Sequence, residues 1–466
     1  MMKGYSNREG TMCVLRLSRL IVLGIALWST TAEATTYYVA PTGNDANTGT
    51  SISTPFRTIG KAASVAQPDD VVNVRGGTYN EAVTLPRGGT PGNPITYQRY
   101  QSEAPILDGT GISTCAGSSA YGVLIRVPNI VWDGISIRNF DGTVGCSIGG
   151  VRLVDMGDST SYTIIRNSTI SNVDALGNPS CIYVQDYYAG TLEIANNVLH
   201  DCGGAESANP ANRAGITIFS DGLQSGMTSF VWVHHNEVYN EGVGIKYKHQ
   251  SLAGVGTATF EYNLVHDIPG PGCLQSEQPG TIIRNNICYN QTDTDISGMR
   301  LSNTGGGGAC PNCQAYNNSF YNVRSGFYVG TGTTGVTIRD NIICTTGYGW
   351  GVVTDSGSTI SVLDYNDYCG LAVTNVLSLQ FTTSYILIGA RGLGYEAHGF
   401  TGDPLYVNPT GNPPDFHLKA GSPAKGAGTG GFDMGAYRTG TEVIGPTSGG
   451  QGSSPPPAAP ANLRIS

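Results

Sequence analysis

TIIRNSTISN at residues 163–172 is one copy of a ten-residue pattern that recurs along the chain. In each copy apolar residues alternate with polar ones, and the sixth place holds Asn in seven of eight copies. The other copies are LEIANNVLHD at 192–201, VWVHHNEVYN at 231–240, ATFEYNLVHD at 258–267, TIIRNNICYN at 281–290, CQAYNNSFYN at 313–322, VTIRDNIICT at 336–345 and SVLDYNDYCG at 361–370. The sixth-place residues lie 23 to 39 residues apart, so we expect one structural coil per copy, with insertions at the surface.

A second pattern follows each ten-residue copy. It starts with Gly or another small residue and continues with apolar alternation, as in GVRLVD at 150–155, CIYVQD at 181–186, GITIFSD at 215–221, GIKYKH at 244–249 and GMRLSN at 298–303. Alternation with a period of two is typical of strands, so each coil should carry at least two strands separated by turns. An Asn repeated at one place can hydrogen-bond to its equivalent in the next coil, which favours a stack of parallel coils.

These repeats resemble those of right-handed parallel β-helices of the pectate-lyase type. The N-terminal segments YYVAPTGND at 37–45, PFRTI at 55–59, PDDVV at 68–72 and GTYNE at 77–81 are similar to those of exported β-helix proteins related to family-nine polysaccharide lyases. DFHL at 415–418, GSPA at 421–424 and DMGAY at 433–437 are similar to the closing segment of that group. The resemblance covers residues 36–438 and implies an all-β solenoid of roughly eleven coils, with residues 58–67 as an N-terminal capping helix.

The N-terminus is expected to be an export signal. Arg16 and Arg19 precede an apolar run at residues 20–28 that is too short to span a bilayer, and an Ala-Glu-Ala sequence follows at 32–34. We therefore predict a signal peptide at 1–34, a β-helix domain at 35–440 and a Gly/Ser/Pro-rich disordered tail at 441–466, in a secreted, monomeric protein.

Composition limits the function. The chain has 466 residues, a formal net charge of −9 and only 13% charged residues, with 66 Gly. An acidic chain is a poor candidate for binding nucleic acid or an anionic membrane.

Ten of the eleven cysteines follow the signal segment, and an even number in an exported chain is compatible with disulfides whose pairing the sequence leaves open. Cys310 and Cys313 form a CxxC motif, which we interpret as a bridge or two inert thiols rather than a metal or redox site. Cys344 and Cys369 share the ninth place of successive repeats, so stacked coils would bring them within disulfide reach, and a disulfide and two buried thiols both stay open.

The second strand of each coil should present one polar column to solvent, because side chains alternate between core and surface. Aromatic and amide groups in such a column suit a sugar chain, which has apolar faces and hydroxyl edges. The expected substrate-binding residues are Tyr183, Gln185, Phe219, Gln275 and Tyr328. The predicted partner is therefore an extracellular or cell-wall polysaccharide.

Lys246 and Lys248 project from one strand in a chain with few lysines. Crowded cations lower a lysine pKa, which suits a general base near neutral pH. β-Elimination of a uronate needs such a base, for which Lys248 or Lys246 is the candidate. It also needs a cation that neutralises the carboxylate, which Arg300 or a bound Ca²⁺ could supply. Family-nine and family-six lyases resemble this plan with a Lys base and Ca²⁺, and that resemblance implies Asp221 and Glu277 as Ca²⁺ ligands, although the dense Asp cluster of family nine is absent.

Two other functions stay open. A glycoside hydrolase needs two carboxylates at a defined separation, for which Asp186, Asp221 and Glu277 are the candidates across coils. A non-catalytic glycan-binding or adhesin-like surface protein would need the exposed column alone.

Overall fold

The computed structural model describes residues 33–447, except 113–119, 142–147, 155–159, 175–177, 186–189, 204–211, 221–227, 250–254, 293–297, 303–307, 347–348 and 371–374. Apart from Glu33, the described residues belong to one compact unit, Ala34–Ser466. The predicted signal peptide lies almost entirely outside the described residues, as do Cys115, Cys146, Asp186, Asp221 and residues 448–466. In the described part of the chain, no helix is long and apolar enough to cross a membrane.

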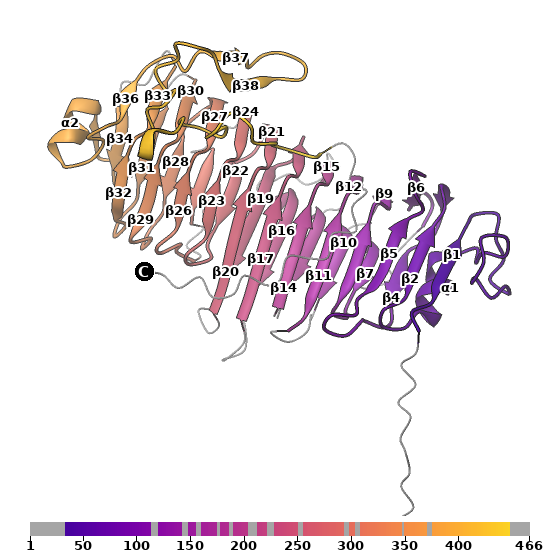
Figure 1. Cartoon of the computed structure of the whole chain (residues 1–466). Helices are drawn as coiled ribbons and strands as arrows, with labels where there is room; N and C mark the ends of the chain where they lie inside the picture. The colour runs from indigo at the N-terminus through magenta and orange to yellow at the C-terminus, as the bar shows by residue number, and fades with distance from the viewer. Residues whose placement is uncertain are drawn as a thin grey trace, which may run out of the picture. The chain divides into compact units, whose positions relative to one another are not determined.

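Three sheets of 12 strands run along the unit, and each coil contributes one strand to each of them (Figure 1). Within each sheet, neighbouring strands are three apart in chain order, except that β1 pairs with β2 and β34 with β35. Pairing within the three sheets is parallel, apart from the antiparallel pair of β34 and β35. The predicted parallel β-helix is therefore confirmed, with apolar side chains from all three sheets in one continuous core.

Sheet A holds the first strand of each ten-residue repeat and sheet B holds the second. The strands of sheet A are β1 (Thr36–Val39), β2 (Val71–Val74), β5 (Ile95–Arg99), β8 (Ile130–Asp133), β11 (Tyr162–Arg166), β14 (Gly190–Ala195), β17 (Thr228–His234), β20 (Val255–Glu261), β23 (Ile282–Arg284), β26 (Gln314–Tyr316), β29 (Val336–Arg339) and β32 (Ile360–Asp364). Those of sheet B are β3 (Gly77–Tyr79), β6 (Pro105–Asp108), β9 (Ser136–Asp141), β12 (Thr169–Asp174), β15 (Val198–Cys202), β18 (Glu237–Tyr239), β21 (Leu264–Ile268), β24 (Ile287–Gln291), β27 (Ser319–Val323), β30 (Ile342–Thr345), β33 (Asp367–Cys369) and β36 (Phe400–Thr401).

Sheet C holds the strands of the second pattern. They are β4 (Val83–Leu85), β7 (Ala120–Ile125), β10 (Ile148–Val154), β13 (Ser180–Gln185), β16 (Ala214–Ser220), β19 (Val243–His249), β22 (Gly272–Ser276), β25 (Met299–Leu301), β28 (Phe327–Val329), β31 (Trp350–Thr354), β34 (Asn375–Leu379) and β35 (Thr383–Tyr385). Ile245 and Tyr247 of β19 lie in the core, as their place in the alternation predicted.

The turn between sheets A and B carries the predicted asparagine ladder. Each sixth-place amide donates to the next one along the stack, from Asn197 to Asn236 at 3.0 Å and onward to Asn366. The left-handed conformation falls one residue earlier, because the fifth-place residues have φ between 52° and 58°. In each turn, the fifth-place residue thus adopts the left-handed conformation and the sixth-place Asn makes the hydrogen bonds between coils.

The N-terminal end of the core is closed by α1 (Ile59–Val65). Thr58 caps this helix by accepting from the Lys61 N–H, and Ile59, Ala62 and Ala63 are buried. The helix packs against β1 and β4, the first strands of sheets A and C, so the predicted capping helix is confirmed.

The C-terminal end is closed by α2 (Leu387–Gly392) and the residues after it. Glu396 ends the ladder, since its carboxylate accepts from the Asn366 side chain at 2.7 Å and from the Tyr368 hydroxyl at 2.6 Å. A hairpin of β37 (Tyr406–Asn408) and β38 (Asp415–Leu418) follows, and a short 3-10 turn spans Thr429–Gly431.

The residues after the hairpin run back over the outer side of sheet B as a C-terminal strap, residues 424–447 (Figure 1). Met434 and Ala436 pack against Ile287 and Ile342. Gly445 donates to the Tyr262 carbonyl at 2.8 Å. Residues 441–447, which the composition predicts to be part of a disordered tail, therefore lie along the coils.

Four disulfides join described cysteines: Cys181–Cys202, Cys273–Cys288, Cys310–Cys313 and Cys344–Cys369. The CxxC motif is therefore a bridge, and the pair at the ninth place of successive repeats is bonded as the stack would allow.

Candidate functional site

One outward column of sheet C collects half of the site residues that the sequence singled out. Strand register aligns one residue from each of seven successive coils, which we call the sheet C row: Arg152, Tyr183, Thr217, Lys246, Gln275, Arg300 and Tyr328. Two places further along the strands, Gln185, Phe219 and Lys248 align in the same way. Neighbouring strands lie about 4.8 Å apart, so the sheet C row spans roughly 29 Å.

The middle of the row is charged but covered. Lys246 lies between the core residues Ile245 and Tyr247, so its side chain leaves the strand on the outer side. Only 2% of Lys246 and 2% of Arg300 are exposed, and Gln275 between them is also buried. Buried charges on the outer side of a sheet are costly, which marks this place as a candidate site.

Lys246 has an altered acidity. Burial, together with the neighbouring charge of Lys248, lowers the pKa of its amine to about 7. The carboxylates of Glu277 and Glu241 act in the opposite direction. A lysine with such a pKa is partly neutral at neutral pH and can therefore accept a proton.

The rest of the row is held by polar and aromatic contacts. The Gln275 amide donates to the Ser302 carbonyl at 3.2 Å. Arg300 lies 5.5 Å from the ring centre of Tyr328, whose hydroxyl donates to Asp355 at 3.0 Å. At the other end of the row Arg152 donates to Gln185, and its guanidinium lies 5.8 Å from the Tyr183 ring.

Glu277 lies beside this row, as the coil spacing predicted. The Glu277 N–H donates to the Tyr247 carbonyl at 2.9 Å. Glu277 therefore lies next to Lys248, one coil further along the stack. The Gly308 N–H donates to the Glu277 carboxylate at 3.2 Å, and Ala309 pairs with Ser302. The chain at 308–309 thus lies beside the middle of the row, at Glu277 and Ser302.

The described residues in and beside the row do not fit a Ca²⁺ site. Ca²⁺ takes six to eight oxygen ligands, whereas Glu277 is one carboxylate with the amine of Lys246 close to it. Asp221, the other expected ligand, lies outside the described residues.

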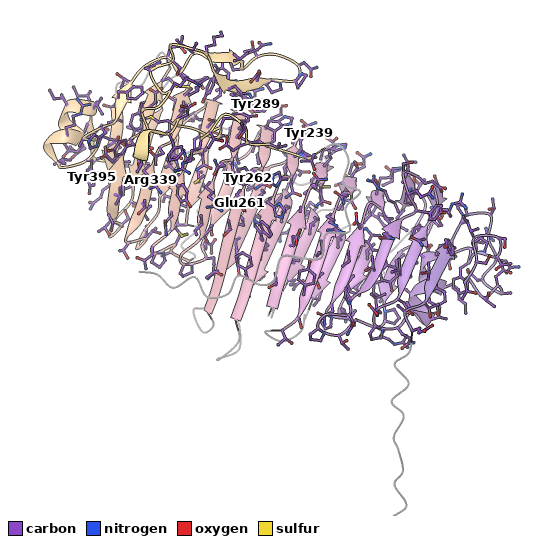
Figure 2. The ribbon with its side chains drawn as sticks, in the orientation of Figure 1. Tyr239, Glu261, Tyr262, Tyr289, Arg339 and Tyr395 are labelled. Atoms are coloured by element: carbon purple, nitrogen blue, oxygen red, sulfur yellow. A yellow bond between two sulfur atoms is a disulfide. The ribbon has the colours of Figure 1, made fainter. Side chains whose placement is uncertain are left out.

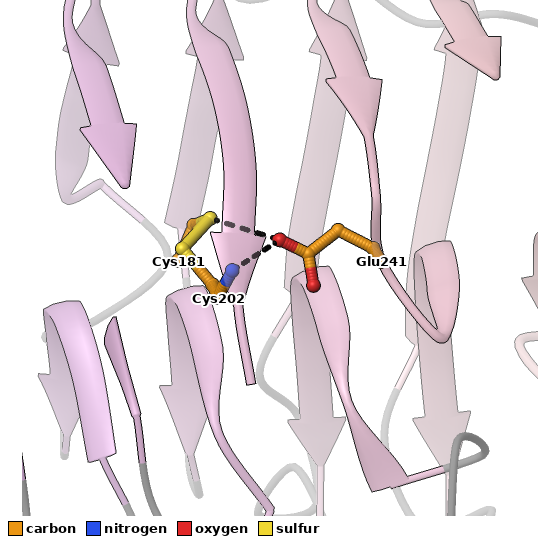
Figure 3. A group of neighbouring side chains, drawn as sticks. All are labelled: Cys181, Cys202 and Glu241. Carbon is orange, nitrogen blue, oxygen red and sulfur yellow. Dashed lines mark hydrogen bonds between the residues drawn. A yellow bond between two sulfur atoms is a disulfide. The ribbon is translucent and has the colours of Figure 1, made fainter. Parts of the chain in front are cut away.

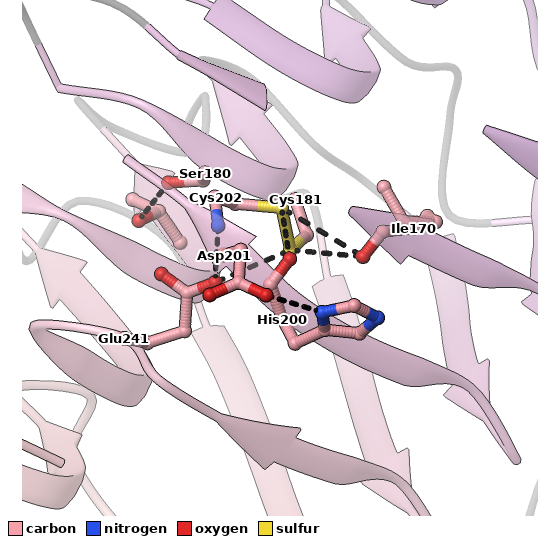
Figure 4. The surroundings of a disulfide bond; sticks show 8 residues. Ile170, Ser180, Cys181, His200, Asp201, Cys202 and Glu241 are labelled. Carbon is pink, nitrogen blue, oxygen red and sulfur yellow. Dashed lines mark hydrogen bonds and ion pairs between the residues drawn. A yellow bond between two sulfur atoms is a disulfide. The ribbon is translucent and has the colours of Figure 1, made fainter. Parts of the chain in front are cut away.

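Three residues of types that often bind metals lie close together elsewhere, where β13, β15 and the turn before β19 meet. Cys181, Cys202 and Glu241 bring their ligand atoms within 4.8 Å of one another (Figure 3). The two sulfurs are bonded to each other, so they offer no thiolates to a metal. Glu241 instead accepts from the Cys202 N–H at 2.7 Å, and burial raises its pKa well above the ordinary value (Figure 4).

Glu241 is the residue near Lys246 that the sequence did not predict. It lies in the turn between sheets B and C, outside both repeated patterns, so no periodic signal marks it.

The outer faces of sheets A and B carry rows of side chains that stack on one another or form hydrogen bonds and ion pairs with one another. On sheet B, ring centres of His200 and Tyr239 lie 4.7 Å apart, and the stack continues through His266 to Tyr289. Tyr239 and Tyr289 are labelled in Figure 2. On sheet A, Glu261 accepts from Trp232 and Arg284. Stacked faces and paired charges explain these rows as structural, which leaves the sheet C row as the candidate site.

Comparisons with known proteins agree with the fold. Residues 37–178 match the family model described as Pel9A-like, right handed beta helix region. "Uncharacterized protein YwoF" of Bacillus subtilis (strain 168) is 29% identical over 139 residues, and this match covers 29% of the present chain and 28% of that protein.

Two solved structures share the architecture at low identity. Pectate lyase Pel9A is 13% identical with a TM-score of 0.57, and the match covers 86% of this chain and 96% of that one. GH136 lacto-N-biosidase from Eubacterium ramulus is 14% identical with a TM-score of 0.54, and 79% and 67% of the two chains are covered. The chain therefore has the right-handed parallel β-helix fold of pectate lyase Pel9A and contains a Pel9A-like right-handed β-helix region at residues 37–178.

Proposed function

We propose that this protein is secreted, binds an acidic polysaccharide along the sheet C row and cleaves it by β-elimination. The observation that carries the proposal is Lys246, a lysine on the outer side of a sheet with a pKa of about 7, in register with Gln275 and Arg300. Structural likeness to a pectate lyase and to a lacto-N-biosidase supports a carbohydrate substrate for this fold.

The reaction assigns one task to each of two side chains. The neutral Lys246 amine removes the proton on carbon 5 of a uronate, and the electron pair forms a double bond between carbons 4 and 5 as the bond from carbon 4 to the glycosidic oxygen breaks. The leaving oxygen takes a proton from water or from the Lys246 ammonium. Arg300 lies two strands away, about 9.6 Å along the row, where its charge stabilises the carboxylate on which negative charge develops.

Access is part of the proposal, because Lys246 is covered. The substrate has to displace what covers the amine, and residues 308–309 lie against Glu277 beside it. Lys248 is half-buried and aligns with Phe219, so it belongs to the binding surface for the same chain.

The test is incubation of the purified protein with pectate, alginate and glycosaminoglycans, each with and without Ca²⁺. We expect absorbance of unsaturated uronate ends with at least one polymer, and Lys246→Met should lower kcat about 100-fold or more. Lys419→Met, at an exposed lysine after β38, is the matched control and should keep full activity. Thermal unfolding of both variants shows whether they are folded.

Other outcomes of this assay would indicate a different function. New reducing ends without unsaturated ones would indicate a hydrolase. Glycan affinity without any cleavage would indicate a binding protein, and full elimination activity in a folded Lys246→Met variant would exclude Lys246 as the base.

A further inference from the structure

An aromatic group lies near the C-terminal end of sheet C and includes Tyr328, the last member of the sheet C row. Tyr328 comes from β28, Trp350 from the start of β31, and Phe381 from the loop between β34 and β35. The Phe381 ring centre lies 6.0 Å from that of Tyr328 and 6.3 Å from that of Trp350. Three segments distant in sequence thus bring their rings together on one face.

Phe381 is held in a conformation that disfavours it. Gln380 and Phe381 both have positive φ, 53° and 56°, and the Thr382 N–H donates to the Leu379 carbonyl at 3.0 Å. This is the geometry of a type I′ turn, in which Asn-Gly is strongly preferred. A large side chain here costs of order 1 kcal/mol or more, and such residues cluster at ligand-binding places.

The strain is not compensated by burial of the ring. Phe381 is 43% exposed, so its side chain gains little from the core. The turn therefore presents an aromatic face to solvent at a cost in stability, which a structural role does not explain.

The other two rings are fixed by their polar atoms. The Trp350 indole N–H donates to the Ser384 hydroxyl at 3.2 Å, and the Tyr328 hydroxyl donates to Asp355. Thr331 also donates to Asp355, at 2.8 Å. The rings are thus preorganised, and hydroxyl and carboxylate groups border them, as sugar recognition requires.

We propose that Tyr328, Trp350 and Phe381 form an aromatic subsite that binds one pyranose ring of the polysaccharide. Tyr328 belongs both to the sheet C row, where it follows Arg300, and to the aromatic subsite, where it contacts Phe381. The subsite therefore continues the row toward the C-terminal end of the solenoid, and the inference rests on the proposed function, namely that the row binds a glycan.

Phe381→Gly tests the subsite without endangering the fold. Glycine accepts positive φ, so the variant should unfold at the same temperature as the wild type or at a higher one. Phe432→Ala, at an aromatic residue of the C-terminal strap that is 40% exposed, is the matched control.

The measurement is calorimetric titration with galacturonate oligosaccharides of three and eight residues, or with mannuronate ones if alginate is the polymer bound. We expect Phe381→Gly to weaken binding of the eight-residue chain about three- to tenfold and to leave binding of the three-residue chain unchanged. Equal binding of both lengths by Phe381→Gly and wild type would overturn the subsite alone. A wild type that binds no oligosaccharide would overturn the proposed function and the subsite with it.

Discussion

Glycine and cysteine share one column at the start of the sheet C strands. A Cβ atom added at any of its glycines would collide with an apolar side chain of sheet B; the glycines are Gly122, Gly150, Gly215, Gly244, Gly298, Gly326 and Gly351. Where the column holds Cys181 or Cys273, the residue is bonded to a cysteine of sheet B instead. Close approach of sheets B and C thus explains why the second pattern starts with a small residue.

Glu241 gives a prediction at this scale. Burial raises its pKa, so the folded state keeps a proton that the unfolded state loses above pH about 4.5. The stability that this group contributes is therefore present below that pH and is lost as the pH rises. We expect Glu241→Gln, which cannot ionise, to show a shallower decline in the free energy of unfolding between pH 5 and pH 8, by about 1–3 kcal/mol.

Urea denaturation at the two pH values measures this difference. Glu103→Gln is a useful contrast, because the Gly76 N–H and Arg75 lower the pKa of Glu103. That variant should lose similar stability at both pH values. An unchanged pH dependence in Glu241→Gln would refute the account of Glu241.

At the scale of elements, each ten-residue repeat consists of a strand of sheet A, a two-residue turn and a strand of sheet B. The buried Asn286 shows how the turn is stabilised, since its amide donates to the Phe260 carbonyl and to Asn318, and its oxygen accepts from Asn263. Each such bond links one coil to the next, so the ladder joins local turns into a stack.

Asn286→Ala should therefore be costly. It leaves buried donors and acceptors of three coils without partners, and we expect a loss of about 2–3 kcal/mol in the free energy of unfolding. Asn290→Gly is the control, because Asn290 has φ 56° and its side chain makes an exposed bond to Asp267. Chemical denaturation compares the two, and equal stabilities would speak against the ladder as a stabilising element.

Repetition explains what could be predicted from the sequence. The sixth-place asparagines, the core positions of β19 and the register of Lys246 with Gln275 and Arg300 all follow from periodic patterns. Glu241, Glu396 and Phe381 lie in turns or in the C-terminal segment, where no period applies. Their neighbours come from distant parts of the chain, so only the folded structure identifies their contacts.

At the scale of the whole solenoid, stacking of the coils brings residues that recur once per coil together on one surface. Residues of seven coils from Arg152 to Tyr328 form one straight column, although 176 residues separate its ends. Sheet B is covered in part by the C-terminal strap, and the outer side of sheet A carries paired charges. This distribution leaves sheet C as the face suited to a long polymer.

The pH dependence of elimination by the wild type and by Lys246→Met tests this account most directly. A rise in pH through about 7 deprotonates the Lys246 amine, so kcat/KM of the wild type should increase tenfold per pH unit below 7 and level off above it. The residual activity of Lys246→Met should lack that inflection. A wild-type profile that is flat from pH 5 to pH 9, or an inflection near 7 that survives in the variant, would contradict the assignment of Lys246 as the base.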